Sequence, residues 1–298
     1  MIKQLLRKLT PNPLDRLLKK AEQKQTRKIL LFWNRGLGDI ALGLYAIVHR
    51  IREYLPRAEI TFLTRENLRD GFRLLGGVEI LVSPSLKRGE KPPVSELLSE
   101  LGVDPEDFDL ILENPNPTQW VQWQLGKLTP RLAWQKEWDG LWKKFDLDPN
   151  ASYIGAHVQT ETNYAHWRNW PLSSWHELFE KVTQGGKKVL LFGFEKEPAF
   201  AIPGVIDLRG DTPLFELLSI IKNRCEALVV PDSGVSSMTY FLEESFPIKL
   251  VSLWADPYMG ILKQNVPSPN PELIHVPLLG ENKDITNITA ERVYAELS

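Results

Sequence analysis

Residues 28–54 read KILLFWNRGLGDIALGLYAIVHRIREY and contain the pattern that decides the fold. The run 28–33 is short and apolar, which is typical of a buried β-strand. A glycine-rich turn follows over 34–38, and apolar residues then recur every three or four positions to about residue 54, which predicts a helix. A strand, a glycine turn and a helix in this order indicate the start of a βαβ unit with parallel strands.

The alternation of strands and helices continues along the chain and restarts once. In the first half, three further strands are expected, over 58–64, 78–82 and 110–112. In the second half, four strands are expected, over 152–157, 188–192, 227–230 and 249–253. Helices are predicted between and after them, over 173–183, 214–221, 234–243 and 289–297. Such alternation is typical of parallel sheets with crossover helices.

We therefore predict two doubly wound α/β domains with a cleft between them. The best linker is 143–150, which ends in Asp-Pro-Asn, so the domains are expected over 29–150 and 151–298. The second domain ends in a closing helix, for which Thr289 is the expected N-cap. A chain of 298 residues has room for two hydrophobic cores.

The composition is that of a globular protein. With 43% hydrophobic and 25% charged residues, wholesale disorder is not expected. The longest apolar run, 40–48, is too short for a membrane helix, which needs about 18 residues, and no apolar segment of a secretory signal follows the basic start. Cys225 is alone, which excludes an intrachain disulfide and a cysteine-based zinc site. We therefore expect a cytoplasmic protein.

Positive charge is concentrated in residues 1–28, a basic amphipathic extension. Nine of the chain's 36 Lys and Arg residues lie here, with only two of its 38 Asp and Glu residues. Residues 29–298 therefore contain 27 basic and 36 acidic residues. The extension therefore carries +7 and the remainder −9. Leu14, Leu17, Leu18 and Ala21 share one helical stripe. The segment is either a helix docked on the protein through these side chains or an anchor for an anionic membrane surface. Nucleic acid is not expected as a partner, because the acidic remainder would repel a phosphate backbone.

Asp39 follows Gly36 and Gly38 at the start of the first predicted helix. The stretch 36–41 also matches the dinucleotide fingerprint G-x-G-x-x-[GA], but the Asp39 carboxylate would then face a pyrophosphate. Two roles remain for Asp39. It is either a helix N-cap or a general base that the helix dipole keeps ionised, with the glycines allowing a substrate to approach the backbone.

Two motifs in the second half predict an anionic ligand, and a third feature concerns a ribose. Pro231-Asp-Ser-Gly234 lies between a strand and a helix, where free amides and the Ser233 hydroxyl would bind an anion; capping by Asp232 or Ser233 is the alternative. Arg168, in Trp167-Arg-Asn-Trp-Pro171, is either a bidentate phosphate clamp or a loop charge stacked on tryptophan. Glu197, just beyond the strand 188–192, is either an acceptor of hydrogen bonds from ribose hydroxyls or only a surface charge. No His, Asp and Glu set has metal-ligand spacing, and no P-loop or nucleophile elbow occurs, so no metal and no other cofactor is expected.

Together these motifs resemble the lipopolysaccharide heptosyltransferases of glycosyltransferase family 9. The shared order is strand–Gly-x-Gly-Asp–helix, strand–His–loop–Trp-Pro, Leu-x-Gly-x-Thr, Asp-Ser-Gly and Asp-Pro. The resemblance runs from about residue 28 to the end, and Leu208-Arg-Gly-Asp-Thr212 followed by Asp232-Ser-Gly234 is its more specific part.

This resemblance implies a GT-B fold and a function. The function is an inverting, metal-independent transfer of a heptose from ADP-heptose to a lipid-linked inner-core saccharide, at the inner face of the cytoplasmic membrane. By motif, Asp39 would be the base and Glu197 the ribose-binding residue. The diphosphate would be bound by Arg168, in place of a usual lysine, with Thr212, Asp232, Ser233 and Gly234. Further candidate site residues are His157, Thr160, Ser237 and Asp256, with Ser237 standing where the family often has histidine.

Two other functions remain open from the sequence. One is an NAD-dependent oxidoreductase that uses 36–41, although the acidic residue required after the second strand has only Glu66 as a poorly spaced candidate. The other is a non-catalytic sugar- or lipid-binding relative, for which Ser237 is the only indication.

Overall fold

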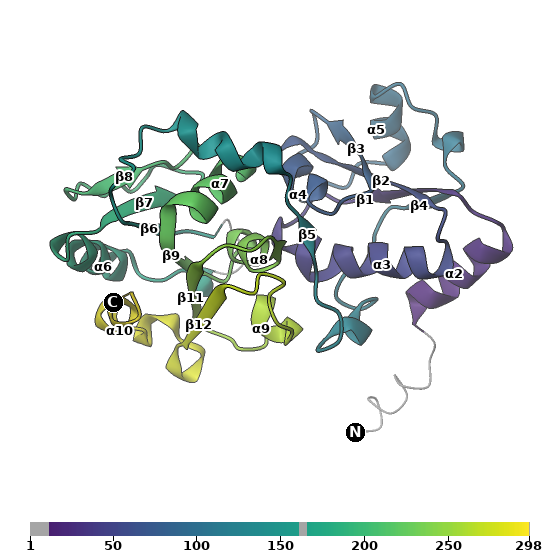
Figure 1. Cartoon of the computed structure of the whole chain (residues 1–298). Coiled ribbons are helices and arrows are strands. Elements are labelled where there is room, and N and C mark those ends of the chain that lie inside the picture. Colours follow the sequence, from purple (N-terminus) through teal and green to yellow (C-terminus); the bar gives the residue numbers. More distant parts are fainter. Residues whose placement is uncertain (1–11, 161–165, 298) are drawn as a thin grey trace. The chain divides into compact units, whose positions relative to one another are not determined.

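The chain forms two compact units, Met1–Pro130 and Arg131–Ser298, which we call unit 1 and unit 2. The structure is a computed structural model that describes residues 12–160 and 166–297 (Figure 1). Each unit contains a parallel sheet with helices packed on it. The predicted α/β class with two Rossmann-like units is therefore confirmed.

The division after Pro130 falls before the linker predicted over 143–150. A 3-10 segment, η5 (Lys136–Lys144), packs along a helix of unit 2. Its buried Trp138 stacks on Phe215 of that helix, with 3.9 Å between the ring centroids. Because these contacts are made with unit 2, the segment that follows Pro130 belongs to unit 2 rather than to a linker.

Four parallel strands form the sheet of unit 1, in the order β3-β2-β1-β4. They are β1 Lys28–Phe32, β2 Glu59–Arg65, β3 Glu79–Ser83 and β4 Leu110–Leu112. The helices are α2 Pro13–Gln23, α3 Tyr45–Tyr54, α4 Arg69–Arg73 and α5 Val94–Glu100, with single turns η2 Glu66–Leu68, η3 Pro105–Asp107 and η4 Gln122–Gln124. Leu30, Phe32 and Leu63 of the sheet form one core with Leu97 and Leu98 of α5. In Figure 1, α3 lies on the other side of this sheet.

The helix predicted over 39–54 begins with a π-helical turn, η1 (Ile40–Leu44), and continues as α3. Gly43 lies in this turn, and a side chain there would collide with Pro117 of the loop after β4. Glycine therefore lets that loop approach the turn at the carboxyl end of the sheet. Single π-turns inside helices are often associated with functional sites.

Six parallel strands form the main sheet of unit 2, in the order β12-β11-β9-β6-β7-β8. They are β6 Tyr153–His157, β7 Lys188–Phe192, β8 Val205–Asp207, β9 Cys225–Pro231, β11 Ile248–Trp254 and β12 Leu273–Leu279. A short pair, β5 Leu132–Ala133 with β10 Leu242–Glu243, lies apart from them. Read from β8 in chain order, the sheet has the order 3-2-1-4-5-6 of a doubly wound dinucleotide-binding fold.

The helices of unit 2 cover both sides of this sheet. They are α6 Leu172–Gln184, α7 Leu214–Arg224, α8 Gly234–Tyr240, α9 Gly260–Gln264 and α10 Ala290–Ala295, with single turns η6 His166–Arg168, η7 Glu281–Lys283 and η8 Ile285–Asn287. In Figure 1, α6 and α10 lie on one side of the strands and α7 on the other. The N-cap predicted at Thr289 is confirmed, because its Oγ1 accepts a hydrogen bond from the Arg292 amide at 3.2 Å.

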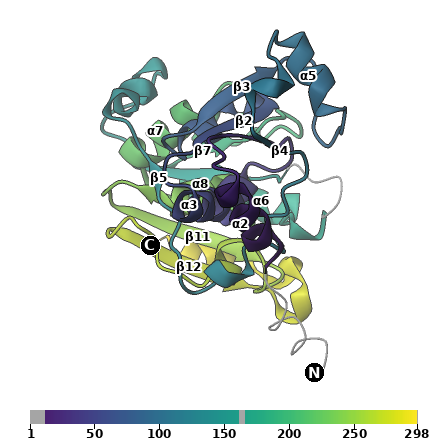
Figure 2. The same cartoon turned by 90° about the vertical axis from the view of Figure 1, so that its right-hand side faces the viewer.

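Helix α2 is docked on unit 1. Leu14, Leu18 and Ala21 are buried, and Figures 1 and 2 show the helix lying against α3. Asp15 forms a bidentate ion pair with Arg50 of α3, at 2.7 and 2.9 Å. Residues 13–23 thus adopt the docked arrangement, whereas residues 1–11 of the predicted extension lie outside the described residues. Within the described ranges, no helix combines the length and the apolar character needed to cross a bilayer.

Candidate functional site

The topology of unit 2 creates a candidate site at the carboxyl ends of β6 and β9. These strands are neighbours, but the chain proceeds from them toward opposite edges of the sheet. In open α/β sheets, ligands bind at such a switch point, outside the carboxyl ends of the strands. The loop after β6 contains Arg168, and the loop after β9 contains Asp232, Ser233 and Gly234. The fold thus gathers two motifs that are far apart in the sequence.

Arg168 and Asp232 are in direct contact at this switch point. Nη1 of Arg168 donates hydrogen bonds to Oδ2 of Asp232 at 3.2 Å and to its backbone oxygen at 3.4 Å. The side chains are 20% and 9% exposed, so the pair is largely shielded from water. Burial raises the pKa of the Asp232 carboxyl, and the Arg168 guanidinium opposes this shift. Arg168 is therefore oriented by a carboxylate rather than being a mobile loop charge.

Ser233 is the N-cap of α8. Its Oγ accepts a hydrogen bond from the Ser236 amide at 3.3 Å, and the Ser233 amide donates to Oγ of Ser236 at 3.2 Å. This reciprocal capping box engages the Ser233 amide, which the sequence analysis expected to be free. The hydroxyl proton of Ser233 is not used by the cap, because Oγ acts there as an acceptor. Ser237 is fully buried and donates its hydroxyl to the Ser233 backbone oxygen at 3.3 Å, which is an internal helix contact.

Gly260 completes this part of the site, and the sequence analysis missed it. Its φ is +46°, and a Cβ on this residue would collide with Oδ1 of Asp232 and lie 2.7 Å from the Trp254 ring. The absent side chain thus leaves room for the Asp232 carboxylate. Asp256 shapes the preceding turn, where its carboxylate accepts from the Tyr258 amide at 2.9 Å and contacts Lys283 at 3.1 Å. These two contacts lower the pKa of Asp256.

The loop that contains Glu197 is held by a buried arginine. Glu197 is exposed in the loop after β7. Arg209 is fully buried, and its Nη2 donates to the backbone oxygens of Lys196 at 2.5 Å and Pro198 at 3.0 Å. Asp207 accepts two further hydrogen bonds from the Arg209 side chain, at 2.9 and 2.7 Å. The motif recognised at 208–212 therefore positions the predicted ribose-binding loop.

Thr212, Thr160 and His157 lie in or next to segments that follow strands of unit 2. Thr212 donates its hydroxyl to the Leu208 backbone oxygen at 3.2 Å, which closes the turn before α7. The Thr160 hydroxyl donates to Oδ1 of Asn169 at 2.8 Å, next to Arg168. His157 ends β6 and is 5% exposed; burial lowers its pKa to about 4, so the ring is neutral near pH 7.

In unit 1, Asp39 stands directly before the π-helical turn η1. Its backbone is helical and its side chain makes no capping hydrogen bond; instead Oδ2 accepts from the Gly36 amide at 3.2 Å. A Cβ on Gly36 would lie 3.0 Å from that oxygen, so glycine gives the carboxylate room. The Gly38 backbone does not adopt a positive φ. Asp39 thus lies half-buried in the loop after β1, at the carboxyl end of the unit 1 sheet.

The Asp39 loop is braced from two neighbouring strands, a feature that the sequence analysis missed. The buried Arg65, at the end of β2, donates to the backbone oxygens of Asn34 at 3.3 Å and Arg35 at 3.2 Å. The Asn34 side chain donates to the Glu90 backbone oxygen at 2.7 Å, in the loop after β3. These contacts fix the turn that presents the Asp39 carboxylate.

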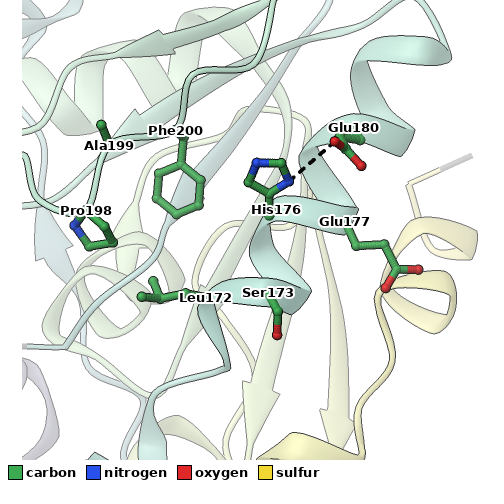
Figure 3. Close-up of a pocket in the computed structure, with 8 residues that line it drawn as sticks. All are labelled: Leu172, Ser173, His176, Glu177, Glu180, Pro198, Ala199 and Phe200. Carbon is green, nitrogen blue, oxygen red and sulfur yellow. Dashed lines mark ion pairs between the residues drawn. The ribbon is translucent and has the colours of Figure 1, made fainter.

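A cavity of about 530 Å³ lies between α6 and the segment that follows Glu197 (Figure 3). It is lined by Leu172, Ser173, His176, Glu177, Glu180, Pro198, Ala199 and Phe200. His176 and Glu180 face each other there at 3.4 Å. The two glutamates in the wall of the cavity make it unfavourable for a phosphate. None of the predicted site residues lines this cavity. In the described parts of the chain, no three His, Cys, Asp or Glu side chains are gathered as a metal ion would require.

Comparison with solved structures identifies the fold. The chain is similar to an E. coli ADP-heptose lipopolysaccharide heptosyltransferase II (TM-score 0.63, 18% identity, 91% of this chain and 97% of that chain). It is also similar to a family 9 glycosyltransferase from Veillonella parvula (TM-score 0.60, 15% identity, 91% and 96%). A third similar structure is an E. coli heptosyltransferase solved with ADP (TM-score 0.50, 14% identity, 90% and 96%). No family model and no curated protein matches the chain. The chain therefore has the GT-B-type fold of family 9 glycosyltransferases, as its motifs indicate.

Proposed function

We propose that the chain is a glycosyltransferase that moves a sugar from a nucleotide-sugar donor to a saccharide acceptor. The observation that carries this proposal is the Arg168–Asp232 pair, at the switch point of a sheet whose fold is shared with heptosyltransferases. One such enzyme, from E. coli, was solved both with ADP and with ADP-2-deoxy-2-fluoro heptose. We therefore take the donor to be ADP-heptose.

Unit 2 would bind the donor. A guanidinium has five N–H donors in a planar fork, so Arg168 has N–H groups left for a phosphate after Nη1 contacts Asp232. The Ser233 hydroxyl and the Gly234 amide would add neutral hydrogen bonds, and the exposed Glu197 would accept from ribose hydroxyls. The charge that develops on the leaving diphosphate would be stabilised by these protein groups, without a metal ion.

Asp39 of unit 1 would act as the general base. The acceptor hydroxyl transfers its proton to the Asp39 carboxylate while its oxygen attacks the anomeric carbon. Attack occurs on the face opposite the diphosphate, so the bond to the diphosphate breaks and the configuration inverts. The Gly36 amide, which donates to Oδ2, orients the carboxylate for this transfer.

The acceptor would be a lipid-linked saccharide such as the inner core of lipopolysaccharide, with the enzyme in the cytoplasm at the inner face of the membrane. The NAD-dependent alternative is disfavoured by the turn in unit 1. There the Gly36 amide, which a pyrophosphate would need, donates to Asp39.

A thermal-shift screen of the full chain tests this proposal. ADP and ADP-sugars should raise the melting temperature, because a ligand at a hundred times its Kd stabilises the folded state by about 2.7 kcal/mol. UDP and GDP serve as nucleotide controls. Stabilisation by NADH, with no response to ADP or ADP-sugars, would contradict the proposed function and favour the oxidoreductase.

A further inference from the structure

The outer side of α2 presents four exposed basic side chains, which we call the cationic face: Arg16, Lys19, Lys20 and Lys24. At 100° per residue they span an arc of about 140°, on the side of the helix opposite Leu14, Leu18 and Ala21. None of the four forms an ion pair with any residue in the ranges 12–160 and 166–297. Their charges are thus directed to solvent.

The acidic side chains near this helix do not neutralise the cationic face. Asp15 is already paired with Arg50, at 2.7 and 2.9 Å, on the flank of the helix. Glu22 is exposed, and by the same helical geometry it lies nearer the docked side. The four basic residues therefore keep a concentrated positive charge on a helix that is rigidly held by its opposite side.

We propose that the cationic face binds the anionic surface of a lipid bilayer by electrostatic attraction alone. An amphipathic anchor buries its apolar side in the lipid, but here that side is already packed in unit 1. Contact through the basic side needs no insertion and no unfolding. The choice of a bilayer as partner rests on the proposed function, because a lipid-linked acceptor requires the enzyme to work at such a surface.

A nucleic acid is a poorer match for the cationic face. Proteins that bind single strands combine basic residues with aromatic side chains that stack on bases. The exposed side of α2 offers charges without aromatic residues. A straight helix of eleven residues, about 16 Å long, also suits contact with a plane. The net charge of −9 on residues 29–298 would repel the rest of the chain from an anionic surface, which favours contact through the helix.

The proposal is tested by sedimenting the full chain with vesicles of phosphatidylcholine that contain anionic phosphatidylglycerol. Each basic residue near an anionic membrane strengthens binding about fivefold. The variant Arg16→Gln/Lys19→Gln/Lys20→Gln/Lys24→Gln should therefore lower the partition coefficient by about 10²–10³-fold. Because screening shortens the reach of these charges, salt at about 0.5 M should release the wild-type protein.

A matched variant separates the position of the charges from their number. Arg57→Gln/Lys127→Gln/Lys143→Gln/Lys263→Gln removes four exposed basic residues elsewhere and changes the net charge equally. This control should bind vesicles like the wild type. Both variants should keep the wild-type melting temperature, since their substituted side chains are exposed. A double reversal, Lys19→Glu/Lys20→Glu, should also lose vesicle binding.

Three results would overturn the proposal. They are equal loss of binding in the control variant, vesicle binding that persists in both α2 variants, and wild-type protein that ignores vesicles but binds tRNA through the cationic face. ADP binding is measured in parallel on the wild type. A chain that binds vesicles as expected but binds no nucleotide would contradict the proposed function. The proposal that the cationic face binds a bilayer would still stand.

Discussion

Gly260→Ala should damage the candidate donor site through one methyl group. The residue has φ +46°, and the new Cβ would collide with Oδ1 of Asp232 and lie 2.7 Å from the Trp254 ring. The ring is rigid and fully buried, so the strain falls on the backbone or on the Asp232 side chain. If Asp232 rotates away, Arg168 loses its hydrogen-bond partner.

The expected loss of unfolding free energy in Gly260→Ala has two separate causes. An L-residue in the left-handed region costs about 1–2 kcal/mol, and an overpacked methyl group costs about 1–3 kcal/mol. The free energy of unfolding should therefore fall by about 2–5 kcal/mol, unless Asp232 moves. In that case the stability loss is smaller and ADP binds up to about ten- to a hundredfold more weakly, the worth of one charge-assisted hydrogen bond.

Gly186→Ala is the matched control. Gly186 also has a positive φ, +83°, but a Cβ there would meet nothing within 4 Å. The Gly186→Ala variant should lose only about 1–2 kcal/mol of unfolding free energy and keep full ADP affinity. Urea denaturation and calorimetric titration with ADP measure both quantities. If Gly260→Ala behaves like Gly186→Ala in both assays, the reasoning about Asp232 is refuted.

Three further predictions concern the base, the metal and the pH dependence. Asp39→Asn should cut the rate of sugar transfer by about 10²–10⁴-fold, because the amide cannot take a proton. The amide oxygen can still accept from the Gly36 amide, so stability should be kept; reduced stability with normal turnover would instead make Asp39 structural. Transfer should persist in excess EDTA, and loss of activity that Mg²⁺ restores would contradict the metal-free mechanism. Burial lowers the pKa of His157 to about 4 from its ordinary 6.5, so the unfolded state binds more protons between these values. Stability is therefore present above about pH 6.5 and falls as the pH drops toward 4, by about 1.4 kcal/mol per unit for each such histidine. Since burial also lowers the pKa of His275 to about 4, His157→Phe should remove only part of this slope; an unchanged urea-melt profile would contradict the assignment.

Local pattern predicts several strands well because their apolar runs are bounded by polar residues. The strands expected over 110–112 and 188–192 are found with the same bounds, as β4 and β7. Strand β12 was missed because Pro277 interrupts its run. Proline is tolerated there because β12 is an edge strand, where one amide side needs no partner. The domain boundary was placed too late because the stacking of Trp138 on Phe215 is a tertiary contact without a local signal.

The candidate-site residues likewise divide into those with a local sequence signal and those without one. Arg168 and the 232–234 turn were found because glycine turns and loop charges are visible as motifs. Gly260, Arg209 and Arg65 position three different segments, which are Asp232, the Glu197 loop and the Asp39 loop. Each acts on a segment distant in sequence, so only the fold shows what it touches. For Asp39, a cap and a base were both compatible with the sequence; in the structure Asp39 precedes η1, and its side chain makes no capping hydrogen bond.

The central claim is that unit 2 binds a nucleoside diphosphate through Arg168. It is tested most directly by calorimetric titration of ADP into the wild type and Arg168→Ala, with Arg131→Ala as an exposed control in the same unit. A charge-assisted hydrogen bond is worth about 1.5–3 kcal/mol, so Arg168→Ala should raise the Kd for ADP about ten- to a hundredfold. Arg131→Ala should leave the Kd unchanged. A wild type that does not bind ADP, or an Arg168→Ala variant that binds it as tightly, would contradict the account.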